Sequence, residues 1–294
     1  MYMDKILKDK VIDLVYKMLS PLSDKAFCII QHRIVNGQRL NIRNPYTYNE
    51  KIQWIKVFDH NPIYHQLVDK IEVRKWVSER IGNSYLIPIV GGPWDNCNQI
   101  DYELLPNQFV LKCTHDSGGI LICHDKSEFD KKYANRFLAN RMKHDYYLHG
   151  REWAYKGLIP KVYAEKYIVD ESGIELKDYK IFCFNGVPKV IQVDFGRYTK
   201  HQRNLYTTDW KYISAEIKYP TNPDYIIEKP VCLDEMLEVA AKLSDGLVQS
   251  RVDLYIVYDR IYFGEITLYQ GSGCEKFRPS EFGNKMGELI KLPS

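Results

Sequence analysis

Helical periodicity dominates the first third of the chain. Over residues 4–19, apolar side chains recur every three or four positions, which predicts an amphipathic helix in an N-terminal extension. Thr47 stands three residues before Glu50, at the start of an apolar helical pattern that runs to Phe58. This spacing is typical of a capping box at a helix start. A further helix is predicted over 64–80.

Beyond residue 108, shorter apolar runs replace the helical pattern and predict β-strands. Short turns join two pairs of these runs, one at Asn185-Gly186 and one near Asp259, which predicts antiparallel hairpins. Strands are predicted over 109–113, 120–123, 161–169, 180–184, 189–194, 251–257 and 261–267, and helices over 129–143 and 233–244. Antiparallel sheets with flanking helices, an α+β architecture, follow from this order.

Length and composition favour a globular cytoplasmic protein. The 294 residues, 45% of them hydrophobic, are enough to bury a core and to form two or three lobes. The seven cysteines are odd in number and scattered, which predicts reduced thiols. Acidic residues interrupt the N-terminal apolar pattern, and no run approaches the roughly 20 apolar residues of a membrane span. We therefore expect neither a signal peptide nor a membrane anchor.

The charge balance argues against one class of partner. The chain has 41 Lys and Arg against 38 Asp and Glu, a formal net charge of +3. Nucleic-acid-binding proteins usually carry a stronger positive charge, so we expect no nucleic-acid partner. The 23 tyrosines fit either surfaces that stack on sugars or a biased base composition of the source genome.

A polar turn between two predicted strands carries the first candidate chemistry. In QFVLKCTHDSGGILIC, a strand delivers Lys112 into a turn made of Asp116, Ser117, Gly118 and Gly119. Backbone N–H groups of such a turn can approach a phosphate closely, and the lysine adds a positive charge. An ordinary hairpin loop has the same composition, so this segment alone leaves both interpretations open.

The stretch SRVDLYIVYDRIYFGEIT carries the second set of residues with candidate chemistry. Alternate residues of a strand share a face, so Arg251 lies beside Asp253, and Glu265 beside Thr267 on the next strand. If the strands pair, two carboxylates and a hydroxyl converge beside one arginine, a set of hard oxygen ligands that suits Mg²⁺ together with phosphate. A solvated Arg–Asp pair is the alternative. However, Glu265 interrupts an apolar run, where an unpaired carboxylate would be costly.

The order of these motifs resembles the ATP-grasp superfamily and, within it, the TupA-like ATP-grasp family, which is linked to teichuronopeptide and other surface-polysaccharide synthesis. The matching phrases are NPYTYNEKIQW, LPNQFVLKCTHDSGG, GREWAYK, LKDYKIFCFNG and RVDLY with IYFGEIT. The resemblance implies two lobes that clamp ATP, with a helical region in place of the usual Rossmann-like N-terminal lobe. The implied segments are a helical N-terminal extension (1–45), a helical N-terminal lobe (46–107), a small lobe with flap and hinge (108–170) and a large lobe with the metal and substrate site (171–294).

The resemblance also implies roles for individual residues. In ATP binding, two lysines hold the phosphates under a glycine flap, and a hinge reads adenine through its backbone. The implied ATP-binding residues are Lys70, Lys112, Asp116, Ser117, Gly118, Gly119, Glu165, Lys166, Tyr167, Ile168 and Glu171, with Asp170 as an alternative to Glu171 at the ribose.

The remaining implied residues belong to the large lobe. The Mg²⁺ ligands are Asp253, Glu265 and Thr267, the last at a position where asparagine is usual. The catalytic residues are Arg251, Lys180 and Arg197. The candidates for substrate binding are His201, Arg203, Asn204, Ser272 and Gly273.

Some side chains have a structural alternative. His201 lies in a polar stretch and fits a solvated loop equally well. His115 either touches phosphate or caps its turn. Trp54 and Trp76 fall on apolar helix faces, which favours the core over a ligand platform. The GREWAYK segment either lines the active site or stabilises a helix start.

The implied reaction is an ATP- and Mg²⁺-dependent ligation of a carboxylate to an amine through an acyl phosphate. Family context suggests a uronic acid and an amino acid or amine as substrates, in a surface polysaccharide (capsule, O-antigen or teichuronopeptide) or its precursor. A sugar kinase with the same ATP site, a nucleotide-binding regulator and a glycosyltransferase are the alternatives, although the chain has no D-x-D triplet. We expect a cytoplasmic enzyme with at most peripheral contact to the inner face of the membrane.

Overall fold

The chain forms two compact units. The computed structural model describes residues 14, 16, 18–170, 176–196 and 201–293. Unit 1 comprises residues up to Phe27, Asn61–Lys75 and Ile87–Tyr167, and unit 2 comprises Cys28–His60, Trp76–Leu86 and Ile168–Ser294. The segment 46–107 therefore contributes to both units. The predicted helix over 4–19 lies largely outside the described residues.

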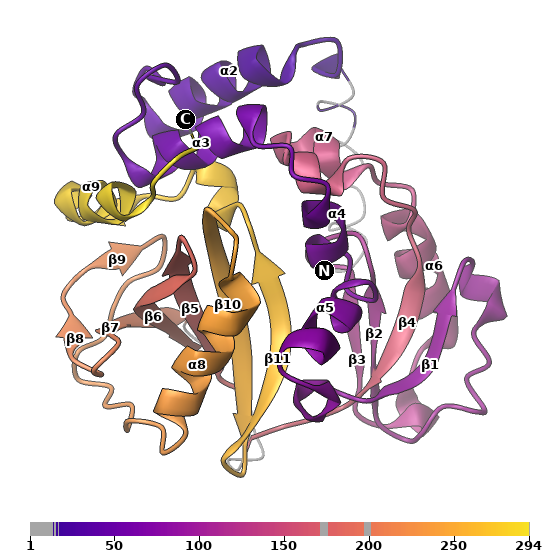
Figure 1. Cartoon of the computed structure of the whole chain (residues 1–294). Coiled ribbons are helices and arrows are strands. Elements are labelled where there is room, and N and C mark those ends of the chain that lie inside the picture. The colour runs from indigo at the N-terminus through magenta and orange to yellow at the C-terminus, as the bar shows by residue number, and fades with distance from the viewer. Residues whose placement is uncertain (1–13, 15, 17, 171–175, 197–200, 294) are drawn as a thin grey trace. The chain divides into compact units, whose positions relative to one another are not determined.

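Unit 1 contains a four-stranded antiparallel sheet in the order β1-β4-β2-β3 (Figure 1). Its strands are β1 (Ile89–Trp94), β2 (Phe109–Cys113), β3 (Ile120–Cys123) and β4 (Val162–Lys166). One face packs with helix α6 (Lys131–Arg141) into an apolar core that includes Leu111, Ala164 and Phe137. Because side chains alternate along a strand, Lys112 and Glu165 lie on the opposite face.

The single helix predicted over 64–80 is wrong, because the chain forms α4 (Ile63–Val68) and α5 (Val73–Arg80) instead. Asp69 causes the break: its Oδ1 accepts hydrogen bonds from the backbone N–H groups of Ile71 at 2.9 Å and Glu72 at 3.0 Å. A side chain that caps backbone donors in this way favours a new helix start over helix continuation. Unit 1 also contains helix α7 (Tyr146–Gly150).

Unit 2 is built on a six-stranded antiparallel sheet in the order β11-β10-β5-β6-β7-β8. The strands are β5 (Asp178–Phe184), β6 (Val187–Phe195), β7 (Gln202–Thr207), β8 (Tyr212–Ile213), β10 (Gln249–Val257) and β11 (Arg260–Thr267). Both predicted hairpins are confirmed, β5 with β6 and β10 with β11. A two-stranded sheet pairs β9 (Glu216–Ile217) with β12 (Phe277–Arg278).

Helix α8 (Leu233–Ser244) lies across one face of the six-stranded sheet (Figure 1). That face is apolar, and the Cys183 thiol reaches the carbonyl of Ala240 there. Burying such a face is the main favourable contribution to the stability of this layer. The alternation of side chains leaves the polar residues of β5, β6 and β10 on the other face.

Three further helices are α2 (Asp24–Asn36), α3 (Tyr48–Phe58) and α9 (Ser280–Leu289). The predicted capping box at the start of α3 is confirmed, with the Thr47 side chain bound to the Glu50 N–H and the Glu50 side chain bound to the Thr47 N–H. Helix α3 packs against α9 and against the 3₁₀ helix Gln270–Gly273. Other 3₁₀ helices are Asn83–Tyr85, Cys97–Gln99, Lys126–Glu128 and Trp153–Tyr155.

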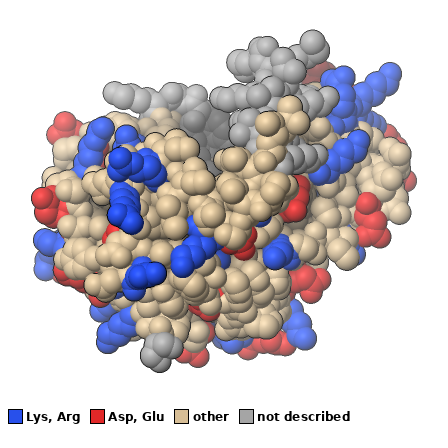
Figure 2. Space-filling view, turned by 90° about the horizontal axis from the view of Figure 1, so that it is seen from above, with Lys and Arg blue, Asp and Glu red and all other residues tan. Residues whose placement is uncertain are grey.

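The predicted reduced thiols agree with the structure, in which all seven cysteines are free. Among the described helices, none has the length and apolar character that crossing a bilayer requires. Trp76 is buried, and its indole N–H donates to the carbonyl of Leu243 at 3.1 Å. Lys and Arg side chains are interspersed with Asp and Glu on the face shown in Figure 2.

Candidate active site

The polar face of the six-stranded sheet brings together the predicted metal ligands and two of the predicted catalytic residues, Arg251 and Lys180. On the paired strands β10 and β11, Arg251 lies opposite Thr267 and Asp253 lies opposite Glu265. On β5, Lys180 lies opposite Asp253. The predicted convergence of two carboxylates and a hydroxyl beside one arginine is therefore confirmed.

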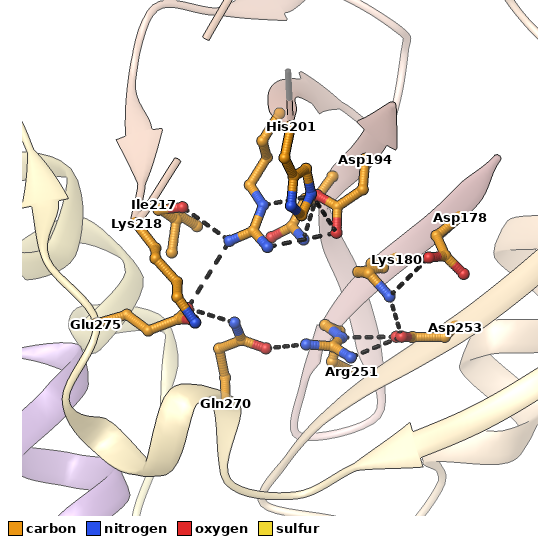
Figure 3. Close-up of polar contacts among 12 residues, drawn as sticks. Asp178, Lys180, Asp194, His201, Ile217, Lys218, Arg251, Asp253, Gln270 and Glu275 are labelled. Carbon is orange, nitrogen blue, oxygen red and sulfur yellow. Dashed lines mark hydrogen bonds and ion pairs between the residues drawn. The ribbon is translucent and has the colours of Figure 1, made fainter. Parts of the chain in front are cut away.

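Arg251 is the centre of this cluster (Figure 3). Its Nε and Nη2 donate to the two oxygens of Asp253, both at 2.6 Å, in the bidentate geometry that gives strong, oriented ion pairs. Nη2 also reaches Oε1 of Glu265 at 3.2 Å, and that oxygen accepts from the Thr267 hydroxyl at 3.2 Å. The remaining Nη1 donates to the side-chain carbonyl of Gln270.

Lys180 supplies the second cation. Its ammonium group donates to Asp253 and lies 3.6 Å from Oδ2 of Asp178. Burial alone would raise the pKa of the Asp253 carboxyl, but Arg251 and Lys180 outweigh it and hold the pKa below its ordinary value. Asp253 thus stays ionised, and it keeps both cations oriented on this face.

The network continues beyond Arg251 through Gln270 (Figure 3). The amide nitrogen of Gln270 donates to Oε2 of Glu275 at 2.5 Å, and Nη1 of Arg203 lies 3.8 Å from the same oxygen. Arg203 also donates from Nε to Oδ1 of Asp194 at 2.7 Å. The polar face therefore carries one connected set of charges from Lys180 to Glu275.

Two of the predicted substrate-binding residues belong to this network. Arg203 is one of them, and His201 is the other, with Nε2 3.7 Å from Oδ2 of Asp194. The His201 ring stacks on Tyr219 with centroids 3.9 Å apart. The ring is therefore held by packing, unlike a solvated loop histidine.

The other three predicted substrate-binding residues hold loops in place. The carbonyls of Ser272 and Gly273 accept hydrogen bonds from Nε2 of Gln53 at 3.0 and 3.2 Å. The side-chain oxygen of Asn204 accepts from the Thr221 hydroxyl at 2.8 Å. Substrate binding by Ser272, Gly273 and Asn204 stays a prediction. The predicted catalytic residue Arg197 and the predicted ribose ligand Glu171 lie outside the described residues.

Unit 1 places the predicted phosphate-binding Lys112 against Glu165. The ammonium group lies 2.5 Å from Oε2, and Nη1 of Arg74 lies 3.6 Å from Oε1 of the same carboxylate. Glu165 is buried beside Tyr163, whose pKa is raised by burial and by this carboxylate. A nucleotide phosphate at Lys112 would therefore compete with Glu165 for the lysine.

The glycine turn is anchored by Asp116. This buried carboxylate pairs with Arg141, whose Nε donates to Oδ2 at 2.6 Å, and Arg141 also bonds the carbonyl of Ser117 at 2.9 Å. The second predicted lysine, Lys70, donates from Nζ to the backbone carbonyl of Asp116. A Cβ on Gly119 would lie 2.5 Å from Oδ1 of Asp116, so any other residue here would force the turn or the carboxylate to move.

Gly118 and Ser117 form the exposed tip of the turn. Gly118 has a φ of +96°, and a Cβ there would meet no atom within 4 Å. An open tip with this backbone is compatible with the predicted approach to phosphate. The side chain of Asp116 points inward to Arg141, so it anchors the turn and does not face a phosphate at the tip.

The predicted hinge lies at a junction of the chain. Unit 1 ends at Tyr167 and unit 2 resumes at Ile168. The N–H of Lys166 donates to the carbonyl of Pro88 at 2.9 Å. Nearby in unit 2, Asp170 pairs with Lys177 at 3.0 Å at the edge of a cavity of about 340 Å³. The adenine and ribose contacts stay predictions.

The residues of unit 2 fit a Mg²⁺ ion that shares phosphate oxygens. Among the described residues, no three His, Cys, Asp or Glu side chains could hold a metal by themselves. The side chain of Asp253 is 2% exposed and committed to Arg251, whereas that of Glu265 is 46% exposed. Carboxylate and hydroxyl oxygens from Glu265, Asp253 and Thr267 would supply part of the coordination, and a nucleotide would supply the rest.

Sequence reasoning missed some members of the network. Asp178 stands two positions before Lys180 on β5, and Asp194 lies opposite Asp178 on β6, so period-two spacing within the β5–β6 hairpin could have indicated both. No local signal indicates that Gln270 and Glu275 face Arg251 and Arg203, because these contacts come from different elements.

Solved structures with limited similarity were found. They include an N5-carboxyaminoimidazole synthetase from Staphylococcus aureus complexed with ADP (15% identity, TM-score 0.42, covering 69% of this chain and 45% of that chain). A D-alanine–D-alanine ligase from Bacillus anthracis complexed with ATP has 14% identity and a TM-score of 0.44, covering 76% and 63%. A D-Ala:D-Ser ligase from Enterococcus faecalis has 14% identity and a TM-score of 0.41, covering 69% and 52%. The chain thus spans less than two thirds of each of these proteins.

No curated protein sequence matches this chain significantly. The family described as TupA-like ATPgrasp matches residues 50–291, which include both candidate lysines, the glycine turn and the polar face of unit 2. The predicted α+β architecture of antiparallel sheets with flanking helices is also present. The chain therefore belongs to the TupA-like ATP-grasp family, with the ATP-grasp fold.

Proposed function

We propose that this protein is an ATP- and Mg²⁺-dependent ligase that joins a carboxylate to an amine. The observation that carries this proposal is the buried cluster of Arg251, Asp253 and Lys180 beside the half-exposed Glu265. Two oriented cations next to a carboxylate that would bind Mg²⁺ can stabilise the charge of a phosphoryl group in transfer. Membership of the ATP-grasp family supports the same reading.

The proposed chemistry has two steps. A carboxylate oxygen attacks the γ-phosphorus of ATP, so that ADP leaves and an acyl phosphate forms. An amine then attacks the acyl carbon. The bond between this carbon and the oxygen that carries the phosphoryl group breaks, so that inorganic phosphate leaves, and the nitrogen loses a proton to give the amide. Mg²⁺ would neutralise phosphate charge. Lys70 and Lys112 would bind phosphates, and Arg251 and Lys180 would orient the transferred group.

The substrate class proposed is a uronic acid of a surface polysaccharide or its precursor, joined to an amino acid or amine in the cytoplasm. The link of the TupA-like family, to which the chain belongs, with surface-polysaccharide synthesis supports this choice. Hydroxylamine trapping tests the reaction: the protein is incubated with ATP, Mg²⁺ and pooled uronic acids, UDP-uronic acids and amino acids, and hydroxamates are sought by mass spectrometry.

A hydroxamate that requires ATP and disappears in Glu265→Gln supports the proposal and identifies the activated acid. A stable phosphorylated sugar would instead indicate a kinase. Binding of UDP-sugar in preference to ATP would indicate a glycosyltransferase. Binding of ATP with no turnover of any acid would indicate a regulator.

A further inference from the structure

Among the described residues that form the ion-pair network of unit 2, carboxylates outnumber cations. Its cations are Lys180, Arg203, Lys218 and Arg251, and its carboxylates are Asp178, Asp194, Asp253, Glu265 and Glu275. Metal binding would use the end of the network near Glu265 and Asp253. Glu275 belongs to the other end and has no part in the chemistry proposed so far.

Glu275 is held in a defined position. Its side chain is 10% exposed, and Oε2 accepts from Gln270 at 2.5 Å, with Arg203 at 3.8 Å. Its other oxygen, Oε1, lies 3.5 Å from Nζ of Lys218. The loop before it is shaped around this side chain, because a Cβ on Gly271 would lie 2.1 Å from Cγ of Glu275.

Tyr48 packs beside this region, with its ring centroid 6.4 Å from that of Phe182 on β5 and 5.5 Å from that of Phe277 on β12. The Tyr48 hydroxyl has no hydrogen-bond partner and is fully buried. Burial raises the pKa of Tyr48, and the charges that act on it are those of Arg251 and Glu275. A polar atom buried without a partner costs free energy, which a bound ligand or water could recover.

Lys218 differs from the other cations because its side chain is 52% exposed. Its backbone is fixed, with the N–H donating to the carbonyl of Lys276 at 2.9 Å, while its ammonium group makes a long contact with Glu275 and lies 5.3 Å from the centre of the Tyr219 ring. Because the lysine end of this pair is exposed and the contact is long, the pair contributes on the order of 1 kcal/mol. Lys218 can therefore leave Oε1 of Glu275 at little cost when a ligand arrives.

The carboxylate of Glu275 and the ammonium group of Lys218 are complementary in charge to the ammonium group and the carboxylate of a free amino acid. From the buried to the exposed end, the network runs from Arg251 through Gln270 and Glu275 to Lys218 (Figure 3). We propose that Glu275 binds the ammonium group of an amino acid and that Lys218 binds its carboxylate. This rests on the proposed function, in which the amino group must lie nearer than the carboxylate to the acyl group activated beside Arg251.

Equilibrium binding tests the proposal without any turnover. The twenty proteinogenic amino acids are screened against the full-length protein by ligand-observed NMR. Each amino acid that binds is then compared with the matching amine, which lacks the carboxylate, and with the matching 2-hydroxy acid, which lacks the ammonium group. Glucuronate is included as an acid without an amine. Melting temperatures confirm that every variant is folded.

The wild-type protein should bind an amino acid at least tenfold more tightly than either matched compound, because each loses one charge-assisted contact. Lys218→Ala should remove the preference over the amine, and Lys218→Arg should retain it. Glu275→Gln should remove the preference over the 2-hydroxy acid. Lys211→Ala, a change to a 79% exposed lysine paired with Asp209, is the matched control and should change neither preference.

Three results would overturn the inference: no amino acid binds, the preferences survive both changes, or glucuronate binds through Lys218 independently of Glu275. Hydroxylamine trapping on the same preparations separates this inference from the proposed function. If hydroxamate forms but the variants keep the wild-type preferences for the amino acid, the ligase activity is supported and the amino-acid subsite is refuted. If the variants lose these preferences but no hydroxamate forms, the amino-acid subsite is supported and the ligase activity is refuted.

Discussion

Lys180 and Asp253 lie opposite each other on the neighbouring strands β5 and β10, and the lysine ammonium donates to the buried carboxylate. The same carboxylate receives two hydrogen bonds from Arg251. One aspartate thus orients both cations of the proposed phosphoryl-transfer site. Removing this carboxylate should affect the fold and the chemistry together, whereas removing Glu265 should affect only the chemistry.

Glu265→Gln should change the free energy of unfolding by less than about 1 kcal/mol, because this side chain is 46% exposed. Asp253→Asn should destabilise the protein by roughly 3 kcal/mol, because it leaves two buried cations poorly paired. Both should lower Mg²⁺-dependent hydroxamate formation at least 100-fold. Chemical denaturation and trapping assays measure these effects. Glu103→Gln, at an exposed carboxylate paired with Lys131, is the control. Equal destabilisation by Glu265→Gln and Asp253→Asn would contradict the different roles proposed for these two carboxylates.

Lys112 has a structural partner and a proposed ligand, and a double mutant separates the two roles. Lys112→Met should destabilise unit 1 by roughly 3 kcal/mol, because it leaves Glu165 buried with only the more distant Arg74 at 3.6 Å and the Tyr163 hydroxyl at 3.4 Å. Adding Glu165→Gln should recover most of that loss. The affinity for ADP, measured by calorimetry, should be more than tenfold weaker than in the wild type for both the single and the double mutant, since neither carries the phosphate-binding charge of Lys112. Full recovery of ADP affinity in the double mutant would show that Lys112 is purely structural.

The two glycines of the turn should respond differently to alanine. Gly119→Ala places a Cβ 2.5 Å from the Asp116 carboxylate, which Arg141 holds, so the turn must move. Gly118→Ala meets no atom and should cost only about 1–2 kcal/mol for its positive φ. Gly119→Ala should therefore weaken ADP binding more than Gly118→Ala, as measured by isothermal titration calorimetry. The reverse order would argue against this turn as a phosphate flap.

His115 should make the stability of the protein depend on pH. Burial, and the charges of Lys70 and Arg141, lower its pKa below the ordinary 6.5 although Asp116 acts to raise it. The unfolded chain then binds the proton more readily, so stability should fall as the pH drops from above 6.5 toward the lower pKa of the folded state. His115→Gln should reduce this slope by at most about 1.4 kcal/mol per pH unit. Unfolding free energies between pH 5 and 8 measure it; an unchanged slope would contradict this assignment.

The sequence predicts best where the determining contacts are local. Thr47 and Glu50 cap α3 as predicted, because both partners of the capping box lie within one turn. Arg251, Asp253 and Glu265 converge as predicted, because period-two spacing within a single hairpin fixes their faces. Local spacing is therefore sufficient for the core of the candidate site.

Contacts between distant segments decide the rest. The break that Asp69 caps within the helix predicted over 64–80 is also held from a distance, because the N–H of Lys70 donates to the carbonyl of Thr114, a residue of another segment. Glu275 meets Arg203 through the pairing of β9 with β12, two strands of two residues each that carry no periodicity to detect. The inward turn of Asp116 likewise depends on Arg141 in α6.

The most direct test of the ligase follows the oxygen atoms. The acid identified by hydroxylamine trapping is labelled with ¹⁸O in its carboxylate and incubated with ATP, Mg²⁺, the protein and an amine that it accepts. An acyl phosphate transfers one carboxylate oxygen to the phosphate that leaves, so we expect one ¹⁸O atom in inorganic phosphate for each amide formed. Inorganic phosphate without ¹⁸O, alongside amide product, would contradict carboxylate phosphorylation by this protein.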